Sequence, residues 1–218
     1  MLGSGIIPFC DFTGTPRDYN SYASLKGKVY NNHKLLINMV EKKERISIFI
    51  DGSNLYYRLQ NLKVEKIDFK KFTDMLTKGR LLVSVFYYNA PLDISIDSKK
   101  YWDQQKFFDA LRRIPGFNVV LARLRKHKKE DGTFGFEVKG DDIYLAVDLV
   151  SGAYENLYDT ALIVSGDEDF VPAIKKVQKL GKRVENIYFC TTSSNYLKKT
   201  CSSSFCIDKK VAKSIELK

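Results

Sequence analysis

Short hydrophobic runs alternate along this chain with longer segments whose apolar residues recur at helical spacing. The runs are rich in β-branched and aromatic side chains, which predicts buried strands at residues 46–51, Leu81–Asn89, 117–124, Thr160–Val164, Arg183–Phe189 and 205–207. Helices are predicted between them at residues 55–62, 68–76, 98–114, Asp141–Tyr154 and 193–200, and in a segment that ends at Leu180 before Gly181. Strands that alternate with helices predict right-handed crossovers and a mainly parallel sheet covered on both faces.

This alternation breaks between the third strand and the helix that begins after Gly140. The segment is strongly basic and has a turn signal at residues 130–133, so it predicts a hairpin that presents a basic strand. The basic positions are Arg123, Arg125, Lys126, Lys128 and Lys129. The alternative is a charged, solvated edge that only prevents pairing with another sheet.

Composition favours one folded domain with flanking segments. The chain has 218 residues, 44% of them hydrophobic, with 13 Tyr and 14 Phe. We expect a poorly ordered extension over residues 1–38, a domain over 39–208 and a basic C-terminal tail over 209–218. No apolar run reaches the roughly 18 residues of a membrane span, and no signal-peptide pattern is present. We therefore expect a soluble, cytoplasmic protein without membrane contact; the sequence leaves its oligomeric state open, with a homodimer as one alternative.

Charge and cysteine content limit which partners and which metal sites we expect. The formal net charge of +10 favours a polyanionic partner without deciding it. Four cysteines without a CxxC pair, together with two histidines, argue against a zinc site or a disulfide framework, so we expect reduced thiols.

Acidic residues follow two of the predicted strands and begin one helix. Asp51 ends the first strand, and Asp167 and Asp169 follow the fourth. The carboxyl ends of parallel strands lie at one edge of a sheet, and a right-handed crossover brings the helix start at Asp141 and Asp142 to the same edge. The simpler alternative is that Asp51 or Asn54 only caps the following helix.

Carboxylates gathered in this way repel one another and raise each other's pKa values unless a cation neutralises them. Oxygen ligands without His or Cys favour a hard cation, Mg²⁺ or Mn²⁺, that is completed by water and substrate phosphate. Such a site predicts hydrolysis of a phosphodiester, with the basic residues holding the backbone. Other phosphate sites fit less well: the chain lacks GxxxxGK[ST] and GxGxxG loops, and Ser53 stands where a phosphatase of the haloacid-dehalogenase type has a second Asp.

Three motifs, FIDGSNLYY, VKGDDIYLAVDLV and IVSGDEDFVPAI, resemble in sequence and order the NYN domains of the PIN-like nuclease superfamily, especially the LabA-like branch. The resemblance covers residues 45–189 and extends towards 207. It implies a three-layer α/β/α Rossmann-like sandwich with a divalent-metal ribonuclease site, whose RNA products carry a 5′-phosphate and a 3′-hydroxyl.

The resemblance also implies roles for individual residues. The residues that match the family's metal ligands are Asp51, Asp142, Asp167 and Asp169, with Asn54 as a supporting polar residue. Asp141 stands where LabA-like sequences have an apolar residue, so the sequence leaves open whether Asp141 or Asp142 binds the metal. Asp148 matches a recurrent acid, but helical geometry turns it away from the point that Asp142 faces. Ser165 and Gly166 either admit a substrate phosphate to the backbone or only form the turn.

The sequence therefore predicts a metal-dependent endoribonuclease that acts on single-stranded or structured RNA. Two alternatives stay open. One is a module that binds RNA or a protein partner without turnover, and the other is a DNA nuclease or a phosphatase that uses the same ions. Recognition of the RNA 2′-hydroxyl depends on contacts that a sequence does not place.

Overall fold

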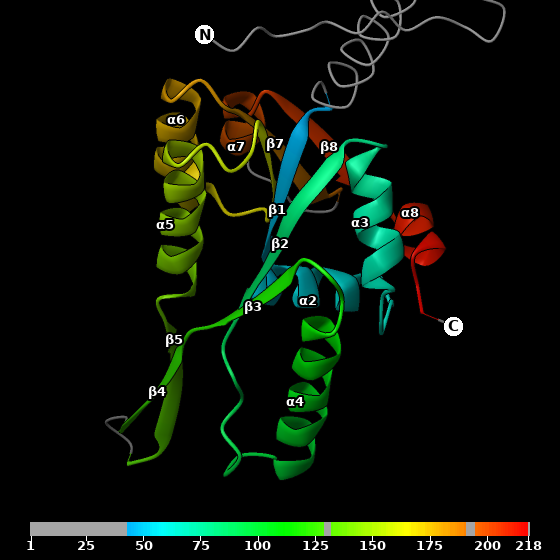
Figure 1. Ribbon diagram of the computed structural model, residues 1–218. Coiled ribbons are helices and arrows are strands. Elements are labelled where there is room, and N and C mark those ends of the chain that lie inside the picture. Colours follow the sequence, from blue (N-terminus) through cyan, green and yellow to red (C-terminus); the bar gives the residue numbers. More distant parts are fainter. Residues whose placement is uncertain (1–42, 129–131, 191–194, 218) are drawn as a thin grey trace, which may run out of the picture. The chain divides into compact units, whose positions relative to one another are not determined.

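The computed structural model describes residues 43–128, 132–190 and 195–217. The central feature is a six-stranded sheet with the strand order β3-β2-β1-β6-β7-β8, in which every neighbouring pair is parallel. Its strands are β1 (Arg45–Asp51), β2 (Leu81–Asn89), β3 (Phe117–Leu121), β6 (Thr160–Val164), β7 (Arg183–Phe189) and β8 (Ser203–Ile207). The expected mainly parallel sheet is confirmed (Figure 1).

Helices cover both faces of this sheet, which makes the fold a three-layer α/β/α sandwich (Figure 1). One face packs against α2 (Gly52–Asn61), α3 (Phe69–Thr77), α4 (Ser98–Arg112) and α8 (Lys209–Ser214). The other packs against α5 (Asp141–Tyr154), α6 (Val171–Lys179) and α7 (Asn195–Thr200). Alternation along β1 explains the two cores, because Ile46, Ile48 and Ile50 enter the first and Phe49 enters the second.

The chain reverses its path across the sheet between β1 and β6. From β1 it proceeds through β2 to β3 on one side, and from β6 through β7 to β8 on the other. In open α/β sheets, ligands bind outside the carboxyl ends of the strands at such a reversal. The fold therefore favours a ligand site at the carboxyl ends of β1 and β6.

A separate two-stranded antiparallel sheet consists of β4 (Arg123–Lys128) and β5 (Phe134–Lys139), so the predicted hairpin is confirmed. The expected third strand at 117–124 was too long. β3 ends at Leu121, because its pairing with β2 stops where Asn89 ends that strand. The apolar pattern continues to Leu124, which belongs to the hairpin instead.

Two further expectations differ from the structure. Residues 209–214 form α8 rather than a tail, and Ala212 and Ile215 are buried in the core. Cys190 and Cys206 are paired as a disulfide next to the β7–β8 ladder, with Cα atoms 5.3 Å apart, while Cys201 is free and buried. The expectation of reduced thiols was wrong for this pair, since adjacency of two strands is not visible in cysteine spacing.

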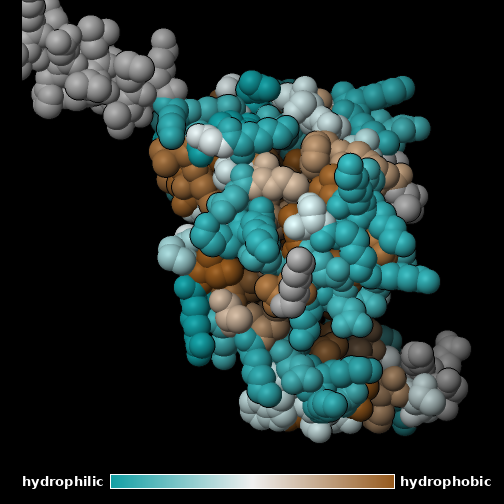
Figure 2. All heavy atoms as spheres, turned by 90° about the vertical axis from the view of Figure 1, so that its right-hand side faces the viewer, coloured by the Kyte–Doolittle hydropathy of each residue, from teal (hydrophilic) through white to brown (hydrophobic). Residues whose placement is uncertain are grey.

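The outer surface is largely polar over the face that α3, α8 and α4 cover (Figure 2). Hydrophobic surface shows there only between hydrophilic side chains. Among the residues described, no helix is long and apolar enough to cross a membrane. The expected extension over residues 1–38 lies outside the described residues.

Candidate active site

Asp51 lies at the carboxyl end of β1 and is 8% exposed. Its Oδ1 accepts a hydrogen bond from the backbone N–H of Asn54 at 2.9 Å, which caps α2. Its Oδ2 accepts a hydrogen bond from the hydroxyl of Ser165 at 2.9 Å, which ties it to the end of β6. Asp51 is therefore a helix cap and also a buried acid at the reversal of the sheet.

The loop after β6 carries two more acids in a fixed turn. The Asp167 backbone N–H donates to Ser165 Oγ at 3.1 Å, and the Asp169 backbone N–H donates to Asp167 Oδ1 at 3.0 Å. These bonds lead into a short 3₁₀-helix, η1 (Glu168–Phe170). Asp167 and Gly166 are half-buried and Asp169 is exposed. The Ser165 hydroxyl thus bonds to both acidic residues, since it donates to the Asp51 carboxylate and accepts from the Asp167 backbone N–H.

The third acidic segment is the start of α5. Gly140 has a φ of 97°, in the region that favours glycine, and Asp141 and Asp142 form the first turn. Asp141 is half-buried and Asp142 is exposed.

Two raised pKa values show that these three segments form one electrostatic group. Although Asp142 is exposed, the partial burial of its carboxyl raises its pKa to about 6, together with the charges of Asp141, Asp51, Asp167 and Asp169. The pKa of Asp51 is also raised, chiefly by burial and further by Asp141 and Asp167, against two hydrogen bonds that lower it. Acids more than one hundred residues apart in the sequence therefore share one edge of the sheet. We name Asp51, Asp141, Asp142, Asp167 and Asp169 the acidic cluster.

The donor chemistry of the acidic cluster fits a hard divalent cation, because the cluster offers only oxygen and its carboxylates repel one another. Within the described residues, no three His, Cys, Asp or Glu side chains are arranged to hold a metal ion. Mg²⁺ is usually bound through one or two carboxylates, with water and substrate phosphate as further ligands, so it does not require a closed cage of protein ligands.

Asp148 lies apart from this group. Its Oδ2 accepts a hydrogen bond from the Tyr88 hydroxyl at 2.9 Å, and burial raises the pKa of Tyr88. Tyr88 stands beside Asp51 in the register of β1 and β2. Tyr88 was not singled out from the sequence, where it is one of several aromatic residues in a buried strand.

Asn186 also escaped the sequence analysis. It is fully buried in β7, and its Nδ2 donates to the carbonyl of Ser165 at 2.8 Å. This bond holds the turn whose hydroxyl contacts Asp51. The only sequence signal is an amide within the otherwise apolar centre of a strand. Its Oδ1 has no partner among the described residues, so the amide contributes through its donor.

Gly52 is required by close packing behind Asp51. A Cβ at this position would lie 2.5 Å from Tyr87 Cζ and 2.6 Å from the carbonyl oxygen of Tyr88. Any side chain would push β1 and β2 apart at the point that sets the position of Asp51.

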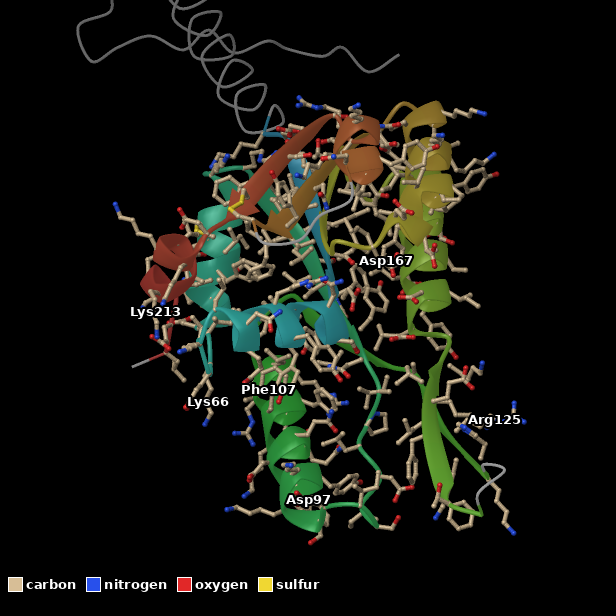
Figure 3. All side chains as sticks on the ribbon, turned by 180° about the vertical axis from the view of Figure 1, so that it is seen from behind. Lys66, Asp97, Phe107, Arg125, Asp167 and Lys213 are labelled. Carbon is tan, nitrogen blue, oxygen red and sulfur yellow. A yellow bond between two sulfur atoms is a disulfide. The ribbon has the colours of Figure 1, made fainter. Side chains whose placement is uncertain are left out.

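The basic residues of the hairpin do not form one surface. Strand alternation places Arg123 and Arg125 on one face of the hairpin, and Lys126 and Lys128 on the other. Arg125 projects from the side turned away from α4 (Figure 3). Lys129, the fifth predicted phosphate contact, lies outside the described residues.

Comparisons with known proteins agree with this architecture. The profile of the NYN domain family matches residues 45–208. This chain belongs to the NYN domain family. A LabA-like relationship is supported by the low amplitude and bright protein LabA of Synechococcus elongatus, which is 27% identical over 139 residues, or 63% of this chain and 69% of that protein.

A solved structure similar to this NYN domain is that of a protein of unknown function from Vibrio parahaemolyticus. The TM-score is 0.61 at 26% sequence identity, and the match covers 76% of this chain and 94% of the other. NYN domains belong to the PIN-like nuclease superfamily, whose members are generally hydrolases that use divalent metals and act on nucleic acids.

Proposed function

We propose that this NYN domain is a divalent-metal-dependent endoribonuclease. The observation that carries the proposal is the acidic cluster: five carboxylates from three separate segments share one edge of the sheet, and two of them have raised pKa values. Burying carboxylates close to one another costs free energy, through lost hydration and mutual repulsion, and a bound cation would offset this cost.

Asp51, Asp142, Asp167 and Asp169 would hold Mg²⁺ or Mn²⁺, with Asp141 as an alternative to Asp142. When bound, the cation supplies Lewis-acid activation of water and of the scissile phosphate. Ser165 and Asn186 are positioning residues, because one holds Asp51 and the other holds the turn of Ser165.

Water attacks the phosphorus of the phosphodiester, one P–O bond breaks, and the products are a 5′-phosphate and a 3′-hydroxyl. A carboxylate of the acidic cluster orients the attacking water. The half-buried Gly166 leaves backbone accessible beside Ser165, where a phosphate oxygen can approach.

The test compares the wild type with Asp51→Asn on labelled single-stranded RNA, duplex RNA and single-stranded DNA. Each substrate is incubated with Mg²⁺, with Mn²⁺ and with a chelator. The matched control is Asp103→Asn on α4, an exposed acid outside the acidic cluster that pairs with Lys106. We expect metal-dependent cleavage of RNA by the wild type and the control, and its loss in Asp51→Asn.

Binding of RNA without cleavage in every metal condition would contradict the enzyme and favour a binding module. Cleavage of DNA but not of RNA would contradict the proposal that RNA is the substrate. The ends of the products give a further check, because a new 5′ end that a kinase can label without prior dephosphorylation is a hydroxyl and would exclude the proposed bond cleavage.

A further inference from the structure

The β4–β5 hairpin extends beyond the central sheet, below the carboxyl ends of its strands in Figure 1. Cross-strand partners in an antiparallel pair point to the same face. One face therefore combines three pairs, Leu124 with Val138, Lys126 with Phe136, and Lys128 with Phe134. We name these six residues the Lys/Phe face.

The Lys/Phe face differs from an ordinary solvated edge in its aromatic content. Phe134 is 57% exposed and Val138 is 37% exposed, although nearby positions carry charge. The Lys126 ammonium lies 4.3 Å from the ring centre of Phe134 and 5.6 Å from that of Phe136. A charge that only prevents edge pairing does not need exposed rings beside it.

An open groove of about 520 Å³ joins the base of this hairpin to the edge of the central sheet. It is lined by residues 91–94 and 121–124 together with Tyr101 and Tyr144. Leu124 belongs both to this groove and to the Lys/Phe face. Asp93 lines the groove, and the charge of Lys126 is near enough to help lower the pKa of its carboxyl, after the hydrogen bonds from Ser95.

One residue of the groove, Tyr144, lies near the start of α5 that carries Asp141 and Asp142, because its ring packs beside Gly140: a Cβ built on that glycine would lie 3.6 Å from Tyr144 Cε2. Tyr144 lies in the first turns of α5, two positions after Asp142, and is half exposed. The groove therefore adds two tyrosine rings, Tyr101 and Tyr144, beside the Lys/Phe face, and Tyr144 belongs to the same helix as Asp141 and Asp142.

We propose that the groove and the Lys/Phe face form a track for single-stranded RNA, with an unpaired base stacked on Phe134 and neighbouring phosphates held by Lys126 and Lys128. This inference rests on the proposed function and specifies its substrate as unpaired RNA. Exposed rings give affinity by stacking on bases, while lysines give an affinity that depends on salt. Bases inside a duplex are already stacked and offer no free face.

Binding is measured by fluorescence anisotropy in the Asp51→Asn background with a chelator, so that cleavage cannot contribute. The probes are a labelled oligouridine and a duplex RNA of equal length. Phe134→Leu removes the ring and keeps an apolar side chain, and Phe134→Tyr restores a ring. The matched control is Tyr154→Leu, an aromatic residue 80% exposed at the opposite end of α5.

We expect Phe134→Leu to weaken binding of the single strand about tenfold, since stacking on an aromatic ring contributes on this order. The duplex should be unaffected, and Phe134→Tyr and Tyr154→Leu should bind like the parent. The salt slope should be unchanged in Phe134→Leu. It should fall by about one per residue in Lys126→Gln and Lys128→Gln.

Equal binding of the single strand by Phe134→Leu and the parent would overturn the track, as would equal losses for single strand and duplex. Phe134 is exposed, and matching melting temperatures show that the variants are folded. Failure of the proposed function would appear separately, as absence of metal-dependent cleavage by the wild type, and would leave these affinities unchanged.

Discussion

Replacing Asp51 by Asn should stabilise the metal-free protein while abolishing its activity. Asn keeps the size of the side chain and an oxygen for the N–H of Asn54. Its amide group would face Ser165 Oγ, which in the wild type donates to the Asp51 carboxylate and accepts from the Asp167 backbone N–H. A hydroxyl has two acceptor sites, so Ser165 can accept from both.

The sign of the effect follows from the pKa of Asp51. Two hydrogen bonds favour the carboxylate, but burial and neighbouring charges outweigh them, and the pKa is raised. A raised carboxyl pKa means that ionisation destabilises the folded state relative to the unfolded state. Removing the charge should therefore increase the free energy of unfolding by about 1 kcal/mol. For a domain of this size, the melting temperature should rise by about 2–4 °C.

The assay is thermal unfolding of the wild type, Asp51→Asn and Asp103→Asn, each in chelator and in millimolar Mg²⁺. A ligand that binds only the folded state raises the melting temperature, so Mg²⁺ should stabilise the wild type and the control but not Asp51→Asn. A melting temperature of Asp51→Asn below that of the wild type in chelator would contradict a destabilising charge at Asp51. Equal stabilisation of Asp51→Asn and the wild type by Mg²⁺ would contradict Asp51 as a ligand of the cation.

Three further predictions test the surroundings of the acidic cluster. In chelator, the free energy of unfolding of the wild type should fall relative to that of Asp142→Asn as pH rises from 3.8 to about 6. The reason is that the Asp142 carboxyl ionises near pH 3.8 in the unfolded state and near pH 6 in the folded state. Denaturant titrations across this pH range measure the difference. Gly52→Ala should lower the free energy of unfolding by about 1–3 kcal/mol, since the new Cβ meets the backbone of Tyr88; a variant as stable as the wild type would contradict this. Tyr88→Phe removes the donor to Asp148 and should lower the free energy of unfolding in urea by about 1–2 kcal/mol, while metal-dependent cleavage is retained. Loss of cleavage in a folded variant would place Asp148 in the active site.

The sequence predicted the buried strands and the start of α5 well. The bounds of β2, α5, β6 and β7 agree with the structure, because each begins or ends at a clear change in hydrophobic pattern. The pattern failed where it continued past a structural boundary. It extended β3 into the hairpin, and it missed α8, which buries only a few residues beneath a lysine-rich surface.

Convergence of the acids was predictable from a general rule, since parallel strands place their carboxyl ends at one edge. The contacts of Asn186 were not, because they depend on which strand lies beside β6. That neighbour is β7, and only the strand order brings the Asn186 amide to the carbonyl of Ser165. The pairing of Cys190 with Cys206 was also not predictable, because it too depends on the strand order, which places β8 beside β7.

The acidic cluster and the Lys/Phe face impose opposite conditions on an RNA chain. The net charge of +10 attracts a polyanion over a distance, but the acidic cluster repels phosphate at short range. We therefore predict that RNA binds the lysines of the hairpin without metal, whereas a phosphate enters the acidic cluster only with a cation that reverses the local charge. Because the two regions have no residue in common, substitutions should separate the proposed binding from the proposed cleavage. In the proposed function, RNA associates with the hairpin before the scissile phosphate is in place, so that the hairpin positions the substrate and the edge of the central sheet carries the cleavage site.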